Sequence, residues 1–221
     1  MQFAAEVISS GLLRASQVLA GLCLLAALPG LRALHGHPER LHLLLGAAVA
    51  LAVLWSVHAH VDPGIALHML GTPAAVLLLG WRLGLLAAAL AAISLPLIGA
   101  TTYALAPAGW LLSAALPGGV VVVIAWLARF YLPRNPFVFI FVCAFFGAGL
   151  AMIVTWTCAA ALLAWSGQPS PSGGSSLVAF LPLVVFPEAF INGVVISMLI
   201  VYRPDWVRLY DERFYTRPQK L

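Results

Sequence analysis

The run FVFIFVCAFFGAGLAMIVTWTCAAALLAW, residues 137–165, carries no charged side chain from end to end. A helix needs only about 20 mainly apolar residues to cross the hydrocarbon core of a bilayer. The rest of the chain has the same character, because 63% of its 221 residues are hydrophobic and 8% are charged. Soluble domains have roughly half and a quarter. The sequence therefore predicts an integral membrane protein.

Apolar runs of this kind recur along the chain and predict about seven membrane-spanning helices. We place them at residues 8–31, 41–60, 66–81, 84–105, 108–131, 136–165 and 177–202. The third run is short and the sixth is long. Lipid-exposed backbone is satisfied only in helices and closed barrels, so we expect an all-α fold. It would be a polytopic transmembrane helix bundle at residues 1–202, followed by a basic, aromatic cytoplasmic tail at residues 203–221.

The basic residues alternate between successive connections and predict an orientation. Short cytoplasmic loops carry an excess of Lys and Arg. The first, third and fifth connections and the tail contain Arg32, Arg40, Arg82, Arg129, Arg134, Arg203, Arg208, Arg213, Arg217 and Lys220, whereas the other connections contain none. We therefore expect the N-terminus outside and the C-terminus inside, in a bacterial-type cytoplasmic (inner) membrane. Aromatic residues suit a tail at the headgroup level, and docking of a cytoplasmic partner there is the alternative.

Several classes of activity lack their sequence motifs. The chain has no GxxxxGK[ST], HExxH or GxSxG pattern, the motifs of nucleotide hydrolysis, zinc proteolysis and α/β-hydrolase chemistry. The net charge of +4 is dispersed between apolar runs, without the basic patch and interleaved aromatics that bind nucleic acid. We expect no enzyme and no nucleic-acid partner, and energy for any transport has to come from another chain or a gradient.

A cluster of metal-binding residue types lies between the second and third predicted spans. His58, His60, Asp62 and His68 fall close together in sequence. Neutral imidazole binds Zn, Cu, Ni and Co, and Asp can add an oxygen ligand. The Pro-Gly pair after Asp62 lets the chain turn back, so that His68 could approach His60. The cluster predicts a metal site beside a short span, where transporters bind substrates; histidines resting at the membrane interface are the alternative.

A second polar feature lies inside the last predicted span. Glu188 follows a proline and precedes Asn192 by about one helical turn, so both residues share a helical face. Charged groups at membrane depth usually serve a transport path or a partner. A glutamate that fixes helix packing is the alternative interpretation. Arg14, within the first span, is the candidate partner.

Short motifs along the chain resemble a known transporter family. They are DPG at residues 62–64, HMLG at 68–71, LLLGW at 77–81, NGVV at 192–195 and YRP at 202–204. Their order and texture resemble the substrate-capture and permease proteins of energy-coupling-factor cobalt and nickel importers, the CbiM/NikM type. The resemblance implies uptake of a divalent transition-metal ion, energised by a separate ATPase through a coupling membrane subunit.

The resemblance carries one ligand across and breaks at another position. His68 matches the histidine that follows the Pro/Gly-rich turn of the family, and so it is the ligand that the resemblance implies. In the family the terminal amine and a histidine at position two complete a nitrogen-rich site, whereas Gln2 stands here. An amide is a poor ligand for soft metals. Either the metal differs, with Co, Ni, Zn or Cu bound through His58, His60 and Asp62 as well, or the chain is a membrane scaffold or assembly factor that keeps the fold.

Overall fold

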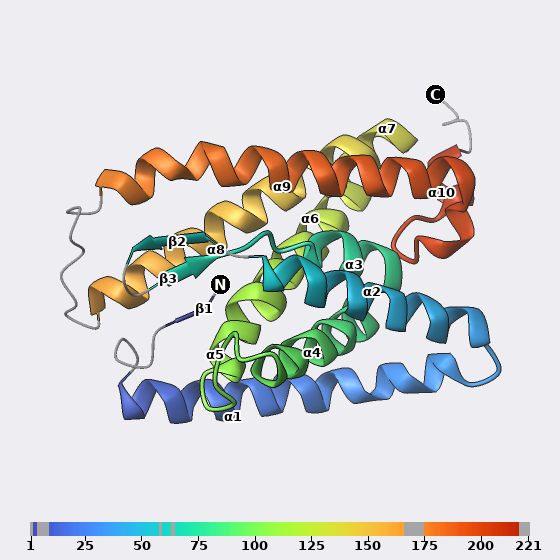
Figure 1. Ribbon diagram of the computed structural model, residues 1–221. Helices are drawn as coiled ribbons and strands as arrows, with labels where there is room; N and C mark the ends of the chain where they lie inside the picture. The colour runs from blue at the N-terminus through green and yellow to red at the C-terminus, as the bar shows by residue number, and fades with distance from the viewer. Residues whose placement is uncertain (1, 4–8, 58, 63–64, 166–174, 217–221) are drawn as a thin grey trace.

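The computed structural model describes residues 2–3, 9–57, 59–62, 65–165 and 175–216. These residues form an elongated bundle of helices with one small sheet at one end (Figure 1). Helix dominates because a segment in lipid has to satisfy its backbone N–H and C=O groups internally. The predicted helical membrane bundle is confirmed in this respect, and the sheet is the exception to it.

Most of the predicted spans correspond to long helices. They are α1 (Ser10–Ala27) with the 3-10 helix η1 (Leu28–Leu34), α2 (Pro38–Ser56), α4 (Trp81–Leu97), the continuous run of α5 (Ala106–Trp110), π-helix η2 (Leu111–Ala115) and α6 (Leu116–Tyr131), the run of α7 (Pro136–Val138), π-helix η3 (Phe139–Phe146) and α8 (Gly147–Trp165), and α9 (Ser175–Tyr202). Within the described ranges, five helical segments are long and apolar enough to cross a membrane, and α4 is a shorter apolar helix.

The third predicted span is wrong as a continuous helix. Its first residues form strand β3 (Ile65–Leu67), which pairs antiparallel with β2 (Ala59–Asp62) and with β1 (Gln2–Phe3). The helix that follows, α3 (Thr72–Leu79), has eight residues and is about 12 Å long, well short of the roughly 30 Å of hydrocarbon in a bilayer. Gly71 and Gly80 bound it with φ values of 63° and 81°, which residues with a Cβ avoid.

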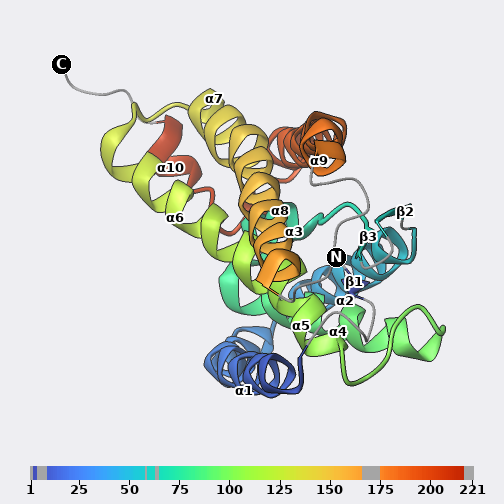
Figure 2. The same cartoon turned by 90° about the vertical axis from the view of Figure 1, so that its left-hand side faces the viewer.

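Helix α3 lies in the middle of the bundle (Figure 2). Most of its residues are buried. It packs against α4, α6 and α9. Two glycines on its neighbours allow this close approach: a Cβ added to Gly84 would lie 2.9 Å from Cα of Val76, and one added to Gly118 would lie 3.1 Å from Cγ2 of Val76. A short helix that lies wholly inside the protein can have polar groups at both of its ends.

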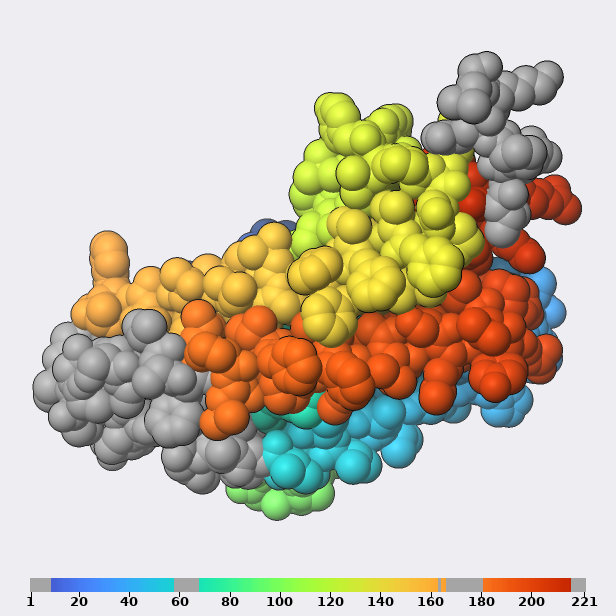
Figure 3. All heavy atoms as spheres, turned by 90° about the horizontal axis from the view of Figure 1, so that it is seen from above, coloured from blue at the N-terminus to red at the C-terminus, as the bar shows by residue number. Residues whose placement is uncertain are grey.

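The outward faces of the long helices are apolar. Val18 and Leu25 of α1 and Phe186 and Met198 of α9 are more than half exposed. Figure 3 shows α9 running along one face of the molecule beside α8. Extended exposed apolar surface marks contact with a membrane or a partner, and on spans of this length it is the surface expected to face lipid.

The two ends of the bundle differ in their charged residues. The sheet lies at one end, and the helices of the tail, η4 (Pro204–Trp206) and α10 (Glu212–Thr216), lie at the other (Figure 1). The guanidinium carbons of Arg129 and Arg134 both lie 4.6 Å from the ring centre of Phe214 in the tail. Gly30 of the first connection packs against the Cβ of Arg82 in the third. The arginine-bearing connections therefore gather around the tail.

The described part of the tail belongs to the core of the bundle. Val207, Tyr210 and Tyr215 are buried in one apolar cluster with Phe139 of η3. The rings of Tyr210 and Tyr215 lie 5.3 and 5.4 Å from that of Phe139. The described part of the tail is thus folded and packs against one end of the bundle.

Candidate functional site

His68 lies at the buried junction between β3 and α3, with 4% of its surface exposed. Its Nδ1 is 2.9 Å from the carbonyl oxygen of Met69. A carbonyl oxygen only accepts hydrogen bonds, so we assign the ring proton to Nδ1, which leaves the lone pair of the neutral ring on Nε2. Nε2 is 3.4 Å from Oγ of Ser113 in η2. An imidazole whose other nitrogen donates to a backbone carbonyl is the arrangement usual for a metal-binding histidine.

The surroundings of His68 fix its ring. The Trp55 ring of α2 lies 5.3 Å from the imidazole, and its Nε1–H donates to the carbonyl of Leu70 at 2.8 Å. Thr72 at the start of α3 donates to the carbonyl of Ser113 at 2.6 Å. Helix α2, helix η2 and the first turn of α3 are therefore joined around this one side chain.

A small cavity of about 20 Å³ adjoins the imidazole. That volume holds about one water molecule. Its lining includes His68, Ser113, Thr101 and Trp110. The Nε1–H of Trp110 is buried and has no acceptor among the described residues. The cavity is thus lined by an imidazole, an indole and two side chains that carry hydroxyl groups.

The other residues of the predicted cluster are placed only in part. In β2 the backbone of His60 lies opposite Ala66, and that of Asp62 opposite Ile65, with an irregularity between them. The chain therefore turns back after Asp62, as expected, and the backbone of β3 pairs with that of β2. The side chains of His60 and Asp62, and the whole of His58, lie outside the described residues. Among the residues that are described, no group of three or more His, Cys, Asp or Glu side chains is assembled, so the ligand set stays a prediction.

The N-terminal strand leads to the same place. Gln2 pairs with Ala66 and Phe3 with Ile65 in the antiparallel register of β1 and β3. The beginning of the chain therefore lies beside the strand that ends immediately before His68.

The predicted pair of Glu188 and Arg14 is wrong. Arg14 lies exposed on α1, whereas Glu188 and Asn192 are 0% and 1% exposed. The carboxylate of Glu188 instead accepts the backbone N–H of Leu70 at 2.7 Å and that of Gly71 at 2.8 Å. A carboxylate satisfies these amides directly and complements the positive end of the helix dipole.

Asn192 completes the attachment at this end of α3. Its Oδ1 accepts the backbone N–H of Ala74 at 2.8 Å. Its Nδ2 donates to Oε1 of Glu188 at 2.8 Å and to the Glu188 carbonyl at 2.6 Å. Of the two sequence interpretations of Glu188, the geometry agrees with the one in which it fixes helix packing.

The opposite end of α3 is held by the tail, which sequence reasoning missed. The backbone N–H groups of Arg208 and Leu209 donate to the carbonyls of Leu78 and Leu77, at 2.9 and 3.1 Å. These are two of the carbonyls that a helix leaves without partners at its C-terminus. We call these two amides and the side chains of Glu188 and Asn192 the α3 clamp.

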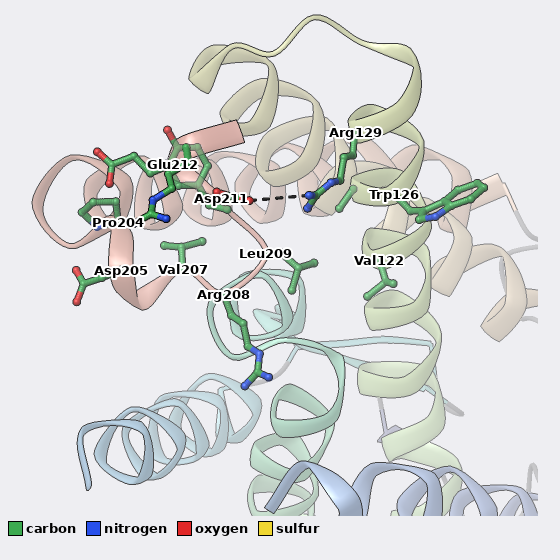
Figure 4. Close-up of a pocket in the computed structure, with 13 residues that line it drawn as sticks. Val122, Trp126, Arg129, Pro204, Asp205, Val207, Arg208, Leu209, Asp211 and Glu212 are labelled. Carbon is green, nitrogen blue, oxygen red and sulfur yellow. Dashed lines mark ion pairs between the residues drawn. The ribbon is translucent and has the colours of Figure 1, made fainter. Parts of the chain in front are cut away.

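A groove of about 700 Å³ lies on the far side of this part of the tail, between the tail and α6 (Figure 4). Arg129 of α6 and Asp211 of the tail face each other, with 3.9 Å between nitrogen and oxygen. Trp126 of α6 also lines the groove, with its ring directed away from Asp211 (Figure 4), and is 57% exposed. The groove therefore offers charged groups and one large aromatic ring at the tail end of the bundle.

Comparison with known proteins identifies the family of this chain. No curated protein and no solved structure matches it. The model of the CbiM family, described as the cobalt uptake substrate-specific transmembrane region, matches residues 3–206. The match includes strands β2 and β3, His68, helix α3 and the whole of α9. It confirms the resemblance seen in the sequence motifs, and the chain belongs to the CbiM family of membrane components for cobalt uptake.

Proposed function

We propose that this protein captures a divalent transition-metal ion at the sheet end of the bundle and passes it across the membrane, with Nε2 of His68 as one ligand. The observation that carries the proposal is the buried His68 ring, held by Trp55 and by the carbonyl of Met69. The family supports transport of a metal. The metal is the cargo in this role, so the protein needs a site that binds the ion and also releases it.

The remaining ligands are proposed from the strands beside His68. His60 and Asp62 of β2 and the preceding His58 supply two imidazoles and a carboxylate in the segment that returns toward His68. Such a set suits Co or Ni, and equally Zn or Cu. The one-water cavity beside the imidazole supports entry of a small ion that keeps little of its hydration shell.

The tail end of the bundle is proposed to be cytoplasmic. The arginine-bearing connections meet there around the tail, and cytoplasmic connections carry such residues. The chain has no phosphate-binding loop of its own. We therefore propose a separate ATPase and a coupling membrane subunit as partners, with the groove between α6 and the tail as part of their contact surface.

The test is metal binding by purified protein with and without His68. Titration calorimetry with Co²⁺ and Ni²⁺ should show binding by the parent, and His68→Ala should lower the affinity at least about tenfold, because one ligand is lost. His42→Ala is the control, since His42 is exposed on α2 and donates or accepts only locally at Pro38. Binding by the parent that His68→Ala leaves unchanged would refute the site, and a parent that binds no Co, Ni, Zn or Cu would favour the scaffold role.

A further inference from the structure

Helix α3 connects the proposed metal ligand with the opposite end of the molecule. His68 lies four residues before its first residue, and the tail amides reach its last turn. A helix this short has little stability of its own, because isolated helices shorter than about 12 residues are marginal in water. Its position is therefore set by the groups that hold its ends.

The C-terminal part of the chain holds both ends of α3. It supplies side-chain acceptors at the first turn and backbone donors at the last turn. Glu188 and Asn192 accept amides at one end, and Arg208 and Leu209 donate to carbonyls at the other. These residues lie on α9 and its continuation into the tail. A shift of the tail along the bundle axis would therefore pull on the last turn of α3, while Glu188 holds the first turn in place.

The tail contact also includes the turn after α3. The Cδ of Arg208 would lie 3.0 Å from a Cβ placed on Gly80, so the arginine side chain lies directly on this residue. A cation near the C-terminal carbonyls of a helix is favourable. The tail thus makes both backbone and side-chain contacts with the end of α3.

We propose that Arg208 and Leu209 are positioning residues of the His68 site: their amides hold the far end of α3 and thereby set the affinity of His68 for the metal. This inference rests on the proposed function. It assigns control of metal capture to the end of the molecule where partners are proposed to dock. Both residues lie beyond residue 206, the last one that the family model matches.

The inference has a reciprocal consequence. If the tail contact raises metal affinity by some factor, bound metal must strengthen the tail contact by the same factor. A purely structural role of the tail in folding would not make its backbone protection depend on metal. Protection of the tail amides is therefore the readout that separates the two roles.

The first experiment needs no substitution. Hydrogen–deuterium exchange of the full chain in detergent should be slower in residues 207–210 when Co²⁺ is added, although His68 is at the other end of α3. Exchange in the exposed connection at residues 35–37 should stay unchanged. Equal exchange in residues 207–210 with and without bound Co²⁺ would overturn the proposal.

The second experiment removes one donor of the clamp. Leu209→Pro deletes the amide bonded to Leu77, and Co²⁺ affinity should fall about tenfold, the effect of one hydrogen bond lost. Leu209→Ala keeps the amide and should bind within about twofold of the parent. Asp205→Pro is the control for proline in the tail, because Asp205 is exposed and its amide makes no hydrogen bond within the described residues.

The outcomes separate this inference from the proposed function. A folded Leu209→Pro protein that binds Co²⁺ as tightly as the parent would overturn the positioning role and leave the metal site standing. A parent that binds no metal would overturn both. If Leu209→Pro does not fold, the exchange experiment on the parent decides.

Discussion

The two ends of α3 are held by different kinds of groups. At the first turn, the side chains of Glu188 and Asn192 accept backbone amides. At the last turn, the backbone amides of Arg208 and Leu209 donate to carbonyls. Both solutions satisfy groups that a helix leaves unpaired. Only the hydrogen bonds at the first turn depend on which side chains are present.

This difference sets how each end responds to substitution. Replacing Glu188 or Asn192 removes acceptors from a buried site, so the cost is large. At the last turn most substitutions keep the amide, and the contact changes only when the backbone path changes. Substitutions at the two ends should therefore differ in size and in kind.

The largest effect is expected for Glu188→Ala. The change leaves the amides of Leu70 and Gly71 and the Nδ2 of Asn192 without their carboxylate partner in a buried site. The Nδ2 of Asn192 keeps its bond to the backbone carbonyl of residue 188, so two donors become unsatisfied. Each unsatisfied buried donor costs about 1–3 kcal/mol, so the free energy of unfolding should fall by about 2–6 kcal/mol. Chemical unfolding in detergent micelles, followed by circular dichroism, measures it.

Glu188→Gln is the matched variant for this end. It keeps the size of the side chain and one acceptor oxygen, but it turns an N–H donor toward one of the two amides. The loss of unfolding free energy should be clearly smaller than for Glu188→Ala. If the alanine variant were as stable as the parent, the first turn of α3 would not depend on this side chain.

The polar residues of the first turn could be found in the sequence, but their partners could not. Glu188 and Asn192 are conspicuous because polar groups are rare in an apolar run, and their spacing places them on one face. The assignment of Glu188 to Arg14 failed because no pattern gives the relative position of the first and last spans. The true partners are backbone amides, which every non-proline residue carries.

The same limit applies around His68 and at the tail. His68 was predicted from residue type and motif, and the structure places it in a buried, oriented position. Trp55 and Ser113, which surround it, come from other helices and have no distinguishing pattern. Gly71 and Gly80 both fall within residues 66–81, which we predicted as one span. Their meaning, a short helix held from both sides, depends on the tertiary contacts of α9 and the tail.

A smaller effect is expected at the last turn from Gly80→Ala. Gly80 has φ 81° and ψ 163°, a region that is essentially restricted to glycine and costs other residues about 1–3 kcal/mol. The new Cβ would also meet Cδ of Arg208 at 3.0 Å. We expect the unfolding free energy to fall by about 1–3 kcal/mol, with the loss of protection concentrated in the tail amides.

Gly119→Ala is the control for this substitution. Gly119 lies in α6, and a Cβ there meets nothing within 4 Å. Alanine in a helix is more stable than glycine by about 0.5–1 kcal/mol, so this variant should equal or exceed the parent. Equal stability of the two alanine variants would contradict a strained turn after α3.

The smallest effect concerns pH and the tail alone. Burial raises the pKa of Tyr215 to about 12, above the value of about 10 for an unfolded chain. Between these two values the folded tail keeps the phenol proton and the unfolded chain loses it. The contribution of the neutral phenol to the free energy of unfolding is therefore complete below about pH 10 and is lost as the pH rises through about 12. Tyr215→Phe keeps the ring packing on Phe139 and cannot ionise. Thermal unfolding in detergent at pH 9 and pH 11 should therefore show a larger loss for the parent than for Tyr215→Phe. The same loss in both would mean that the buried phenol does not link pH to the attachment of the tail.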